Sequence, residues 1–505
     1  MAPRAGEAVG TFALVLHSHL PWLAHAGTWP VGEEWLHQAW AASYAPVVEV
    51  LERLAREGRT ELLTLGVTPV LAAQLDDAYC LREHVTWLGG WLARAEGAAD
   101  AALRAREGAD AIAALERFGS RWAHGASPVL RRLSDSGALE LLGGPATHPF
   151  LPLLDERVAR AQLELGLADA RLRLGTRPEG IWLPECAFRP GLEDVLAGAG
   201  VRRLVLDGPA VHGRTAGAVT LGASDVVAFP RDLAVSYRVW SPRAGYPGGR
   251  WYRDFHTFDH DSGLRPARVT SRGTPSQDKR PYDAGAAVAA VERDARDFVA
   301  VVRERLLGHG AGGRGLVVAA YDTELFGHWW HEGPRWLDRV LRLLPDAGVR
   351  VTTLRGAAEA GCVTGPAQVG ETSWGLRKDW HIWTGPGDLV ESGARLQARL
   401  LAIVDKVGAS AVRSPALDQL TREVFLATSS DWAFMVSHGS AADYARGRGR
   451  DHGHRADRLA DLLEAGQPER ANRLAARWRA VDGPFGGLDG RALLAWPPTA
   501  AVGGR

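Results

Sequence analysis

The chain is short of cysteine, carries no excess of either charge and has no long apolar run, and each of these absences excludes a class of protein. Its 505 residues include three cysteines, Cys80, Cys186 and Cys362, and no CxxC pair. This set argues against a disulfide framework and against a structural zinc site. Lys plus Arg and Asp plus Glu each count 59, so the formal net charge is zero. Nucleic acids and acidic membranes are therefore poor candidates as partners, because both require clustered positive charge.

The apolar runs of the sequence are short throughout. Near the N-terminus, the run at residues 12–16 is shorter than the apolar core of a signal peptide, which is about 7–15 residues long. No stretch approaches the roughly 18 apolar residues of a membrane span. We therefore expect a cytoplasmic protein with no membrane partner. Apolar residues still make up 46% of the chain, which is enough for a large core, and the length predicts roughly two to three domains.

Tryptophan is the residue that the sequence has in excess. There are 19 Trp against 12 Phe and 8 Tyr. The indole ring offers a large flat face and an N–H donor, and the C–H faces of sugar rings stack on such surfaces. Any single Trp is explained equally well as a core residue. As a set, however, the tryptophans favour a carbohydrate-binding site.

Short apolar runs alternate with longer amphipathic stretches from residue 12 to residue 354. The predicted strands lie at residues 12–16, 61–67, 139–144, 180–183, 203–207, 233–240, 315–322 and 349–354. The predicted helices between them include residues 35–58, 156–175 and 285–307. This alternation predicts an α/β fold with a parallel sheet. About seven or eight such units favour a closed or nearly closed barrel.

Three regions depart from this alternation. Residues 76–136 are rich in Ala and charge and predict a helical insertion, and the irregular residues 241–283 predict a lid loop. Beyond about residue 390 the strand signal vanishes. Four helices are predicted there, at residues 394–407, 417–436, 456–466 and 469–481. We therefore expect a catalytic barrel in residues 1–375 and a helical C-terminal domain in residues 376–505 that contributes to the active-site cleft.

Polar side chains follow several of the predicted strands at the point where each strand ends. They are His17, His19, His148, Glu185, Asp207, Asp322 and Glu324. In a parallel barrel the carboxyl ends of the strands meet on one face, and that face carries the chemistry. Singly, each residue has a plainer explanation: Asp207 fits a helix N-cap, and a lone His is more often a core residue than a catalyst. Convergence of all these strand ends is harder to explain in that way.

Two carboxylates on different strand ends favour a glycosidase-type reaction. A retaining enzyme needs one carboxylate as nucleophile and a second carboxyl group as acid and then as base. Glu185 is the candidate nucleophile. Asp322 is the candidate proton donor, because Trp329 and Trp330 would provide a partly apolar site that raises its pKa. Glu324 competes for either role on spacing alone.

The residues leave two other chemistries open. His17 and His19 are spaced so that both project to one side of a strand, and with Asp207 or His148 they are candidate zinc ligands. Metal-dependent carbohydrate hydrolases and deacetylases use such sets. The third class is a glycan-binding protein that is rich in Trp but lacks a working pair of acids.

Ordered motifs along most of the chain carry a resemblance to a known family. They are HSHLPW (17–22), WPVGEEWL (29–36), LLGGPATHPFLPLL (141–154), GIWLPECAFRPG (180–191), GYPG (245–248), WYRDFH (251–256), AAYDTELFGHWW (319–330), TSWG (372–375) and SSDW (429–432). With them, the chain resembles glycoside hydrolase family 57, and within it the 1,4-α-glucan branching enzymes. The resemblance implies an incomplete (β/α)7 barrel of the TIM type with inserted segments, and an all-helical C-terminal domain.

The resemblance also implies roles for individual residues. Glu185 becomes the nucleophile and Asp322 the acid/base. The implied substrate-binding residues are His17, His19, Trp29, His148, Tyr246, Trp374, Trp383 and Asp431. Among these, the histidines contact sugar and no metal, Tyr246 lies at the tip of a flexible lid, and the last two tryptophans stack on glucan. Neither a metal nor an organic cofactor is implied.

The expected activity is a retaining transglycosylation that cleaves α-1,4-glucan and forms α-1,6 branches, as in the synthesis of a glycogen-like polymer. The family also includes α-amylases and 4-α-glucanotransferases, which stay open as alternatives. The expected partner is therefore an α-1,4-glucan chain, and the protein is expected to be a monomer or a weak homo-oligomer.

Overall fold

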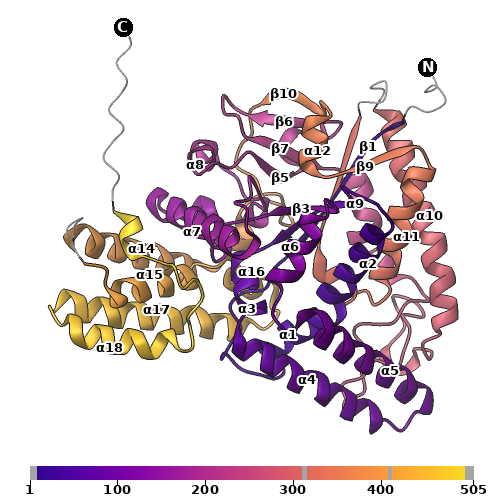
Figure 1. Ribbon diagram of the computed structural model, residues 1–505, viewed down its shortest axis with the longest axis horizontal. Helices are drawn as coiled ribbons and strands as arrows, with labels where there is room; N and C mark the ends of the chain where they lie inside the picture. The colour runs from indigo at the N-terminus through magenta and orange to yellow at the C-terminus, as the bar shows by residue number, and fades with distance from the viewer. Residues whose placement is uncertain (1–7, 310–314, 408–411, 495–505) are drawn as a thin grey trace.

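A computed structural model describes residues 8–309, 315–407 and 412–494 of the chain (Figure 1). Residues 1–7 and 495–505, at the outer ends of the two predicted domains, lie outside the described residues. Within the described part, no helix combines the length and the apolar character that crossing a membrane requires.

The first sheet is built around a fully buried strand, β1 (Gly10–Ser18). Its neighbours are β2 (Leu63–Val67) and β8 (Leu316–Asp322), both parallel to it. The remaining strands are β3 (Leu139–Leu142), which pairs with β2, and β9 (Val349–Thr352), which pairs with the start of β1. A strand buried on both faces has a continuous apolar sequence rather than an alternating one, as β1 does. The register sets His17 directly opposite Asp322.

The second sheet has the strand order β10-β6-β7-β5-β4. Its strands are β4 (Gly180–Ile181), β5 (Arg203–Asp207), β6 (Ala218–Leu221), β7 (Val227–Arg231) and β10 (Val363–Ala367). Strands β4, β5 and β7 run parallel, whereas β6 and β7 form an antiparallel pair. The sequence analysis missed β6, β7 and β10.

Backbone hydrogen bonds join the two sheets at two places. On one side, Gly143 after β3 forms a parallel bridge with Ile181 of β4, and the amide of Trp182 donates to the Gly143 carbonyl over 3.0 Å. On the other side, the amide of Asp232 after β7 donates to the carbonyl of Val318 in β8 over 2.8 Å. The carboxyl ends of strands from both sheets therefore meet in one region.

One predicted strand is wrong. Residues 233–240 form helix α9 (Leu233–Trp240). The side chain of Asp232 accepts a hydrogen bond from the Val235 amide and caps the helix. A short apolar run of β-branched residues does not distinguish a strand from a buried helix by periodicity. The Asp just before the run was the signal for a helix.

Helices surround the sheets and form the insertion. They are α1 (Glu33–Ala39), η1 (Trp40–Tyr44), α2 (Ala45–Arg56), α3 (Pro69–Leu75), α4 (Ala78–Glu96), α5 (Ala101–Arg117), α6 (Ser127–Asp135), α7 (Glu156–Leu174), α8 (Leu192–Gly198), α10 (Ala284–Gly308), α11 (Gly333–Asp346) and α12 (Leu354–Glu359). Helices α4 and α5 lie side by side at the lower edge of the molecule, away from the strands (Figure 1). Residues 241–283 contain only two short turns of 3₁₀ helix, η6 (Tyr246–Gly248) and η7 (Ser276–Asp278).

The C-terminal part of the described chain is helical. Its helices are α13 (His381–Thr384), α14 (Gly387–Val407), α15 (Pro415–Ala427), α16 (Ser430–His438), α17 (Ala442–Glu464) and α18 (Pro468–Arg479). The prediction of one helix over residues 417–436 is wrong, because extended backbone at Ser429 separates α15 from α16. The break redirects the chain, and the amide of Ser430 donates to the carbonyl of His148. The start of α16 thereby reaches the strand ends.

Candidate active site

The polar residues at the strand ends lie on short segments with unusual backbone. Glu185 follows β4 with φ of 60°, and Cys186 and His148 have φ of 48° and 55°. Non-glycine residues in this left-handed region are strained by about 1–3 kcal/mol each, and such residues gather at functional sites. The strain at Glu185 turns a buried carboxylate toward the carboxyl ends of the strands.

Glu185 is held by two hydrogen bonds from the C-terminal half of the chain. The indole N–H of Trp374 donates to Oε2 over 2.9 Å, and the hydroxyl of Ser430 donates to Oε1 over 2.8 Å. Burial raises the pKa of Glu185 to about 7, and these two donors oppose that rise because they stabilise the ionised form.

Asp322 ends β8 in a different environment. Burial raises its pKa well above the ordinary value, and the nearby charges of Glu324 and Glu185 raise it further. Among the described residues, none donates a hydrogen bond to its carboxyl group. Burial and like charge therefore favour the protonated form of Asp322, whereas the donors around Glu185 favour a carboxylate there. Environments that push two carboxyl groups apart in this way separate the acid from the base.

A chain of hydrogen bonds runs from β1 to Glu185. Nε2 of His17 lies 3.1 Å from Nε2 of His148, and Nδ1 of His148 lies 3.0 Å from the Ser430 hydroxyl. Burial lowers the pKa of both histidines well below the ordinary value, so both rings are neutral. The Ser430 hydroxyl donates its hydrogen bond to Glu185, so its oxygen accepts a hydrogen bond from Nδ1 of His148. Nε2 of His148 in turn accepts a hydrogen bond from Nε2 of His17.

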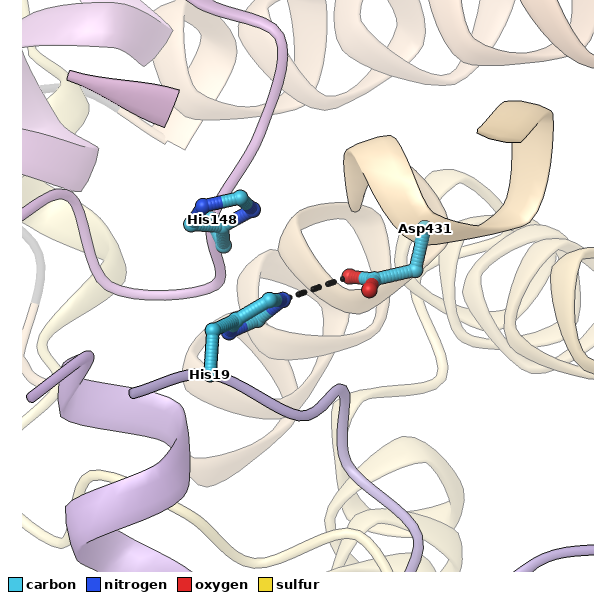
Figure 2. Close-up of side chains that lie close together, drawn as sticks. All are labelled: His19, His148 and Asp431. Atoms are coloured by element: carbon cyan, nitrogen blue, oxygen red, sulfur yellow. Dashed lines mark hydrogen bonds and ion pairs between the residues drawn. The ribbon is translucent and has the colours of Figure 1, made fainter. Parts of the chain in front are cut away.

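The side chains of His19 and Asp431 are hydrogen-bonded across the boundary between the strand ends and α16 (Figure 2). Nε2 of His19 lies 2.9 Å from Oδ2 of Asp431, and the His19 ring stacks on His148 with centroids 3.7 Å apart. Burial raises the pKa of Asp431, but the attraction and the hydrogen bond of His19, together with His148 and the hydrogen bond of Ser429, outweigh burial and lower the pKa to about 2. Asp431 is therefore a fixed negative charge beside the histidines.

Asp207 pairs with two cationic side chains that also contact Trp374. Arg231 donates to Oδ1 of Asp207 over 2.9 Å, and Nζ of Lys378 lies 2.6 Å from Oδ2. The guanidinium of Arg231 lies 5.2 Å from the centre of the Trp374 ring, and Lys378 donates to the Trp374 carbonyl. Asp207 makes no capping bond to the following 3₁₀ helix. The N-cap interpretation of Asp207 is therefore wrong. Among the described residues, Asp207 also does not share a possible metal site with the histidines.

Comparisons with known proteins place the whole arrangement in a family. Residues 13–246 match glycosyl hydrolase family 57, and residues 394–492 match the C-terminal region of 1,4-alpha-glucan branching enzymes. The chain is 52% identical to a probable 1,4-alpha-glucan branching enzyme of Mycobacterium tuberculosis, over 98% of this chain and 100% of that protein. The chain belongs to glycoside hydrolase family 57. The predicted family is confirmed.

Solved structures of family 57 enzymes share the fold of this chain. A branching enzyme of Thermococcus kodakaraensis, crystallised with glucose and additives, superposes with a TM-score of 0.91 at 31% identity over 97% of both chains. An α-amylase of Thermotoga maritima superposes with a TM-score of 0.85 at 26% identity, over 97% of this chain and 99% of that one. Both activities thus occur on closely similar folds, and the site must distinguish between them.

Within this family 57 chain, the structure separates the aromatic residues that were predicted to bind substrate. Trp374 is partly exposed and contacts Glu185 directly. Trp383 is only 1% exposed and stacks on Phe150 with ring centroids 4.9 Å apart. Tyr246 is 9% exposed, and its hydroxyl donates to Asp297 of α10. The buried, hydrogen-bonded phenol of Tyr246 does not fit the tip of a flexible lid. Trp29, in contrast, is 67% exposed.

Glu324, the competitor of the two carboxylates, is occupied by protein groups. Its Oε1 accepts from the amide of His19 over 3.0 Å and from the hydroxyl of Tyr44. Burial raises its pKa to about 7. Tyr44, Ser430 and Arg231 are site residues that the sequence analysis missed. Nothing in the sequence around Tyr44 distinguishes it from a core residue of the predicted helix 35–58.

Three of the predicted substrate residues also meet the spacing of a metal site. One ligand atom from each of His19, His148 and Asp431 lies within 4.8 Å of the other two. However, both ring nitrogens of His148 already have protein partners, and Nε2 of His19 contacts Asp431 directly. Each donor set is satisfied within the protein, so the geometry does not require an ion there.

Proposed function

We propose that this chain is a retaining 1,4-α-glucan branching enzyme with Glu185 as nucleophile and Asp322 as acid and base. The observation that carries the proposal is the pair of carboxyl groups, in which the buried Glu185 has two donors and the partly buried Asp322 has none among the described residues. The names of its most similar relatives and the match to the branching-enzyme C-terminal region support the activity.

In the first step, the carboxylate of Glu185 attacks the anomeric carbon of an α-1,4-linked glucosyl unit. Asp322 gives its proton to the departing glycosidic oxygen. A raised pKa suits Asp322 to this task, because a proton donor must still carry its proton near neutral pH. Retaining enzymes hold such a pair about 5–5.5 Å apart, and that separation is expected here.

In the second step, Asp322 takes the proton from a glucan 6-hydroxyl, which attacks the glycosyl-enzyme and forms an α-1,6 branch. Water competes with the sugar for the same carbon. A hydroxyl that is held in place can reach an effective molarity of about 10⁵ M or more, provided that the site is closed to bulk water. Trp374, fixed by Arg231 and Lys378, is the partly exposed ring best placed to hold glucan beside Glu185.

The scaffold in this proposal is an incomplete (β/α)7 barrel. Strands β8, β1, β2 and β3 continue into β4, β5 and β7 through the Gly143–Ile181 bridge, and the Asp232–Val318 hydrogen bond returns to β8. These contacts support a ring of parallel strands. We place its limits at residues 1–375, with the insertion at 76–136 and the irregular segment at 241–283. We assign residues 376–505 to the helical domain, and Ser430 and Asp431 are its contribution to the cleft.

The partner in this proposal is an α-1,4-glucan chain. Location in the cytoplasm, a monomeric or weakly oligomeric state and independence of metal and cofactor stay predictions from the sequence.

One experiment tests the proposal against its alternatives. The enzyme is incubated with amylose, and new α-1,6 linkages are counted against new reducing ends. A branching enzyme gives many linkages and few reducing ends. An α-amylase gives new reducing ends without new α-1,6 linkages. A 4-α-glucanotransferase redistributes chain lengths and gives neither new α-1,6 linkages nor new reducing ends.

The same assay is then repeated after metal analysis and treatment with a chelator. Unchanged branching with no stoichiometric metal is expected. Loss of activity that zinc restores would establish the metal-dependent hydrolase or deacetylase class instead, and binding without any turnover would establish a glycan-binding protein.

A further inference from the structure

A second cavity lies apart from the carboxylate pair. Its volume is about 670 Å³, and it is lined by α1, η1, α4, Phe258 with residues 260–265, and the turn at Gly327–His328. Neither Glu185 nor Asp322 lines it, and of the predicted substrate residues only Trp29 does. A volume of this size is typical of small-molecule sites, which fall at about 300–1,000 Å³. We infer that this cavity binds a second stretch of α-glucan chain.

Aromatic rings gather on the wall of the cavity. Trp87 and Trp91 lie one turn apart on α4, with ring centroids 5.9 Å apart. Trp29 and Phe258 approach from two loops and are 67% and 45% exposed. Single exposed aromatics are common on protein surfaces, but four rings on one concave wall form a stacking surface. The C–H faces of a chain of glucosyl units fit such a surface.

Fixed hydrogen-bond acceptors lie beside these rings. Glu34 is buried, with Oε2 accepting from the Trp87 indole over 2.7 Å and Oε1 accepting from Gln38. Burial lowers the pKa of His37 to about 4, so its ring is neutral. Each carboxylate oxygen accepts more than one hydrogen bond, which leaves Glu34 able to accept from sugar hydroxyls. The lining carries charges of both signs, because Arg94, Arg253 and Arg265 lie in it together with Glu33, Glu83 and Glu107. Arg253 and Glu107 pair with each other over 2.8 Å. Such a mixed lining offers both donors and acceptors to sugar hydroxyls.

The cavity shares a wall with the active site. Gly327 and His328 line it, and they belong to the turn that follows Asp322 and Glu324. This turn is packed tightly on η1, because a Cβ at Gly327 would lie 1.7 Å from the Ala42 carbonyl oxygen. The inference rests on the proposed function, since a branching enzyme must hold an acceptor chain as well as the chain that it cleaves. A glucan segment in the cavity would be anchored on the far side of the turn from Asp322.

The direct test is hydroxyl-radical footprinting of the Glu185→Gln enzyme with maltoheptaose, read by mass spectrometry. Labelling of Phe258 and Trp87 is expected to fall as maltoheptaose is added, along with labelling of Trp374 at the active site. Unchanged labelling of Phe258 and Trp87 after Trp374 has reached its plateau would overturn the inference and leave the proposed function standing. If none of the three is protected up to the solubility limit, both ideas fail.

A kinetic test uses the otherwise unmodified enzyme on amylose. Phe258→Ala removes an exposed ring, so the KM is expected to rise about 3-fold to 10-fold while kcat changes little. Phe258→Tyr keeps an aromatic face and is expected to retain the parent KM. Leu172→Ala, at an exposed apolar position on α7 outside the cavity, serves as the control. A parent KM in Phe258→Ala contradicts the inference, whereas absence of new branches from the parent enzyme contradicts the proposed function alone.

Discussion

Single residues decide which carboxyl group carries the proton. Both Glu185 and Asp322 are deprived of water by burial, but Trp374 and Ser430 donate to Glu185 alone. A donor stabilises the ionised form, and its removal leaves the penalty of burial unopposed. The indole of Trp374 therefore serves two purposes in this site. Its ring is partly exposed, and its N–H favours the ionised form of Glu185, the proposed nucleophile.

We expect Trp374→Phe to move the acid limb of the pH profile of kcat/KM to higher pH. Loss of the indole donor raises the pKa of Glu185 above its value of about 7, so a higher pH is needed to ionise it. A hydrogen bond to a charged group is worth enough for a shift of about one pH unit. The control is Trp380→Phe, since that indole donates to the Thr372 carbonyl and not to Glu185. If the acid limb of both variants lies at the same pH as in the parent enzyme, this limb does not report the ionisation of Glu185.

Glu185→Gln and Asp322→Asn are each expected to lower activity by about 10³-fold or more, because each removes an essential half of a two-carboxyl mechanism. The stability of these variants should rise and not fall. The folded-state pKa of Glu185 is raised from 4.5 to about 7, so ionisation destabilises the fold as pH rises between these values. At pH 8 the melting temperature of Glu185→Gln is therefore expected to equal or exceed that of the parent. If Glu185→Gln retains activity, the nucleophile is Glu324 instead.

At the scale of elements, hydrophobic pattern predicted the buried parallel strands well and failed where other forces prevail. Strand β1 and helix α10 follow from their apolar runs and caps. The segment of α9 has the same β-branched composition as a strand, and only the capping Asp232 distinguishes it. Strands β6 and β10 are short and carry exposed or partly exposed residues, so no apolar run marks them.

The break between α15 and α16 was equally hidden, because the apolar pattern continues through it. Ser429 adopts extended backbone there, and this turn is what brings Ser430 to Glu185. The family resemblance indicated Asp431 but gave no role to Ser430. The pair of carboxylates could thus be predicted from strand ends and motifs, whereas the groups that set their charge depend on contacts between distant segments.

The ion-pair network at the ends of β5 and β7 should be a point of stability. Asp207→Asn leaves the buried Arg231 and the partly buried Lys378 without their carboxylate, and removal of one partner from a buried pair destabilises by about 3–5 kcal/mol. We expect a fall of this size in the free energy of unfolding by urea. Asp225→Asn is the matched control, since Asp225 is 88% exposed and its pair with Arg202 contributes little. Equal stability of the two variants would show that the network does not hold this end of the sheet.

For the whole molecule, the site exists only where two halves of the chain meet. The strand ends supply Glu185, Asp322 and His19, whereas α16 supplies Ser430 and Asp431. Trp383 and Phe150 pack at this boundary with Ile382 and Ala187. The packing keeps α13 and α16 against the strand ends. In the proposed mechanism, closure of this boundary excludes the water that competes with a sugar hydroxyl for the glycosyl-enzyme.

Trp383 is therefore expected to govern the products through packing and not through direct stacking on glucan. Trp383→Phe leaves a smaller ring in a site that is 1% exposed, which loosens the boundary and admits water. Branches should fall relative to reducing ends, while total cleavage of amylose falls less than branching does. Trp336→Phe is the control, because Trp336 is equally buried but packs on Phe298 of α10, outside the boundary; it should lose stability without a change in the product ratio. If Trp383→Phe instead lowers cleavage and branching in equal proportion, water exclusion at this boundary does not determine transfer, and the choice between sugar and water is made by the acceptor-holding residues alone.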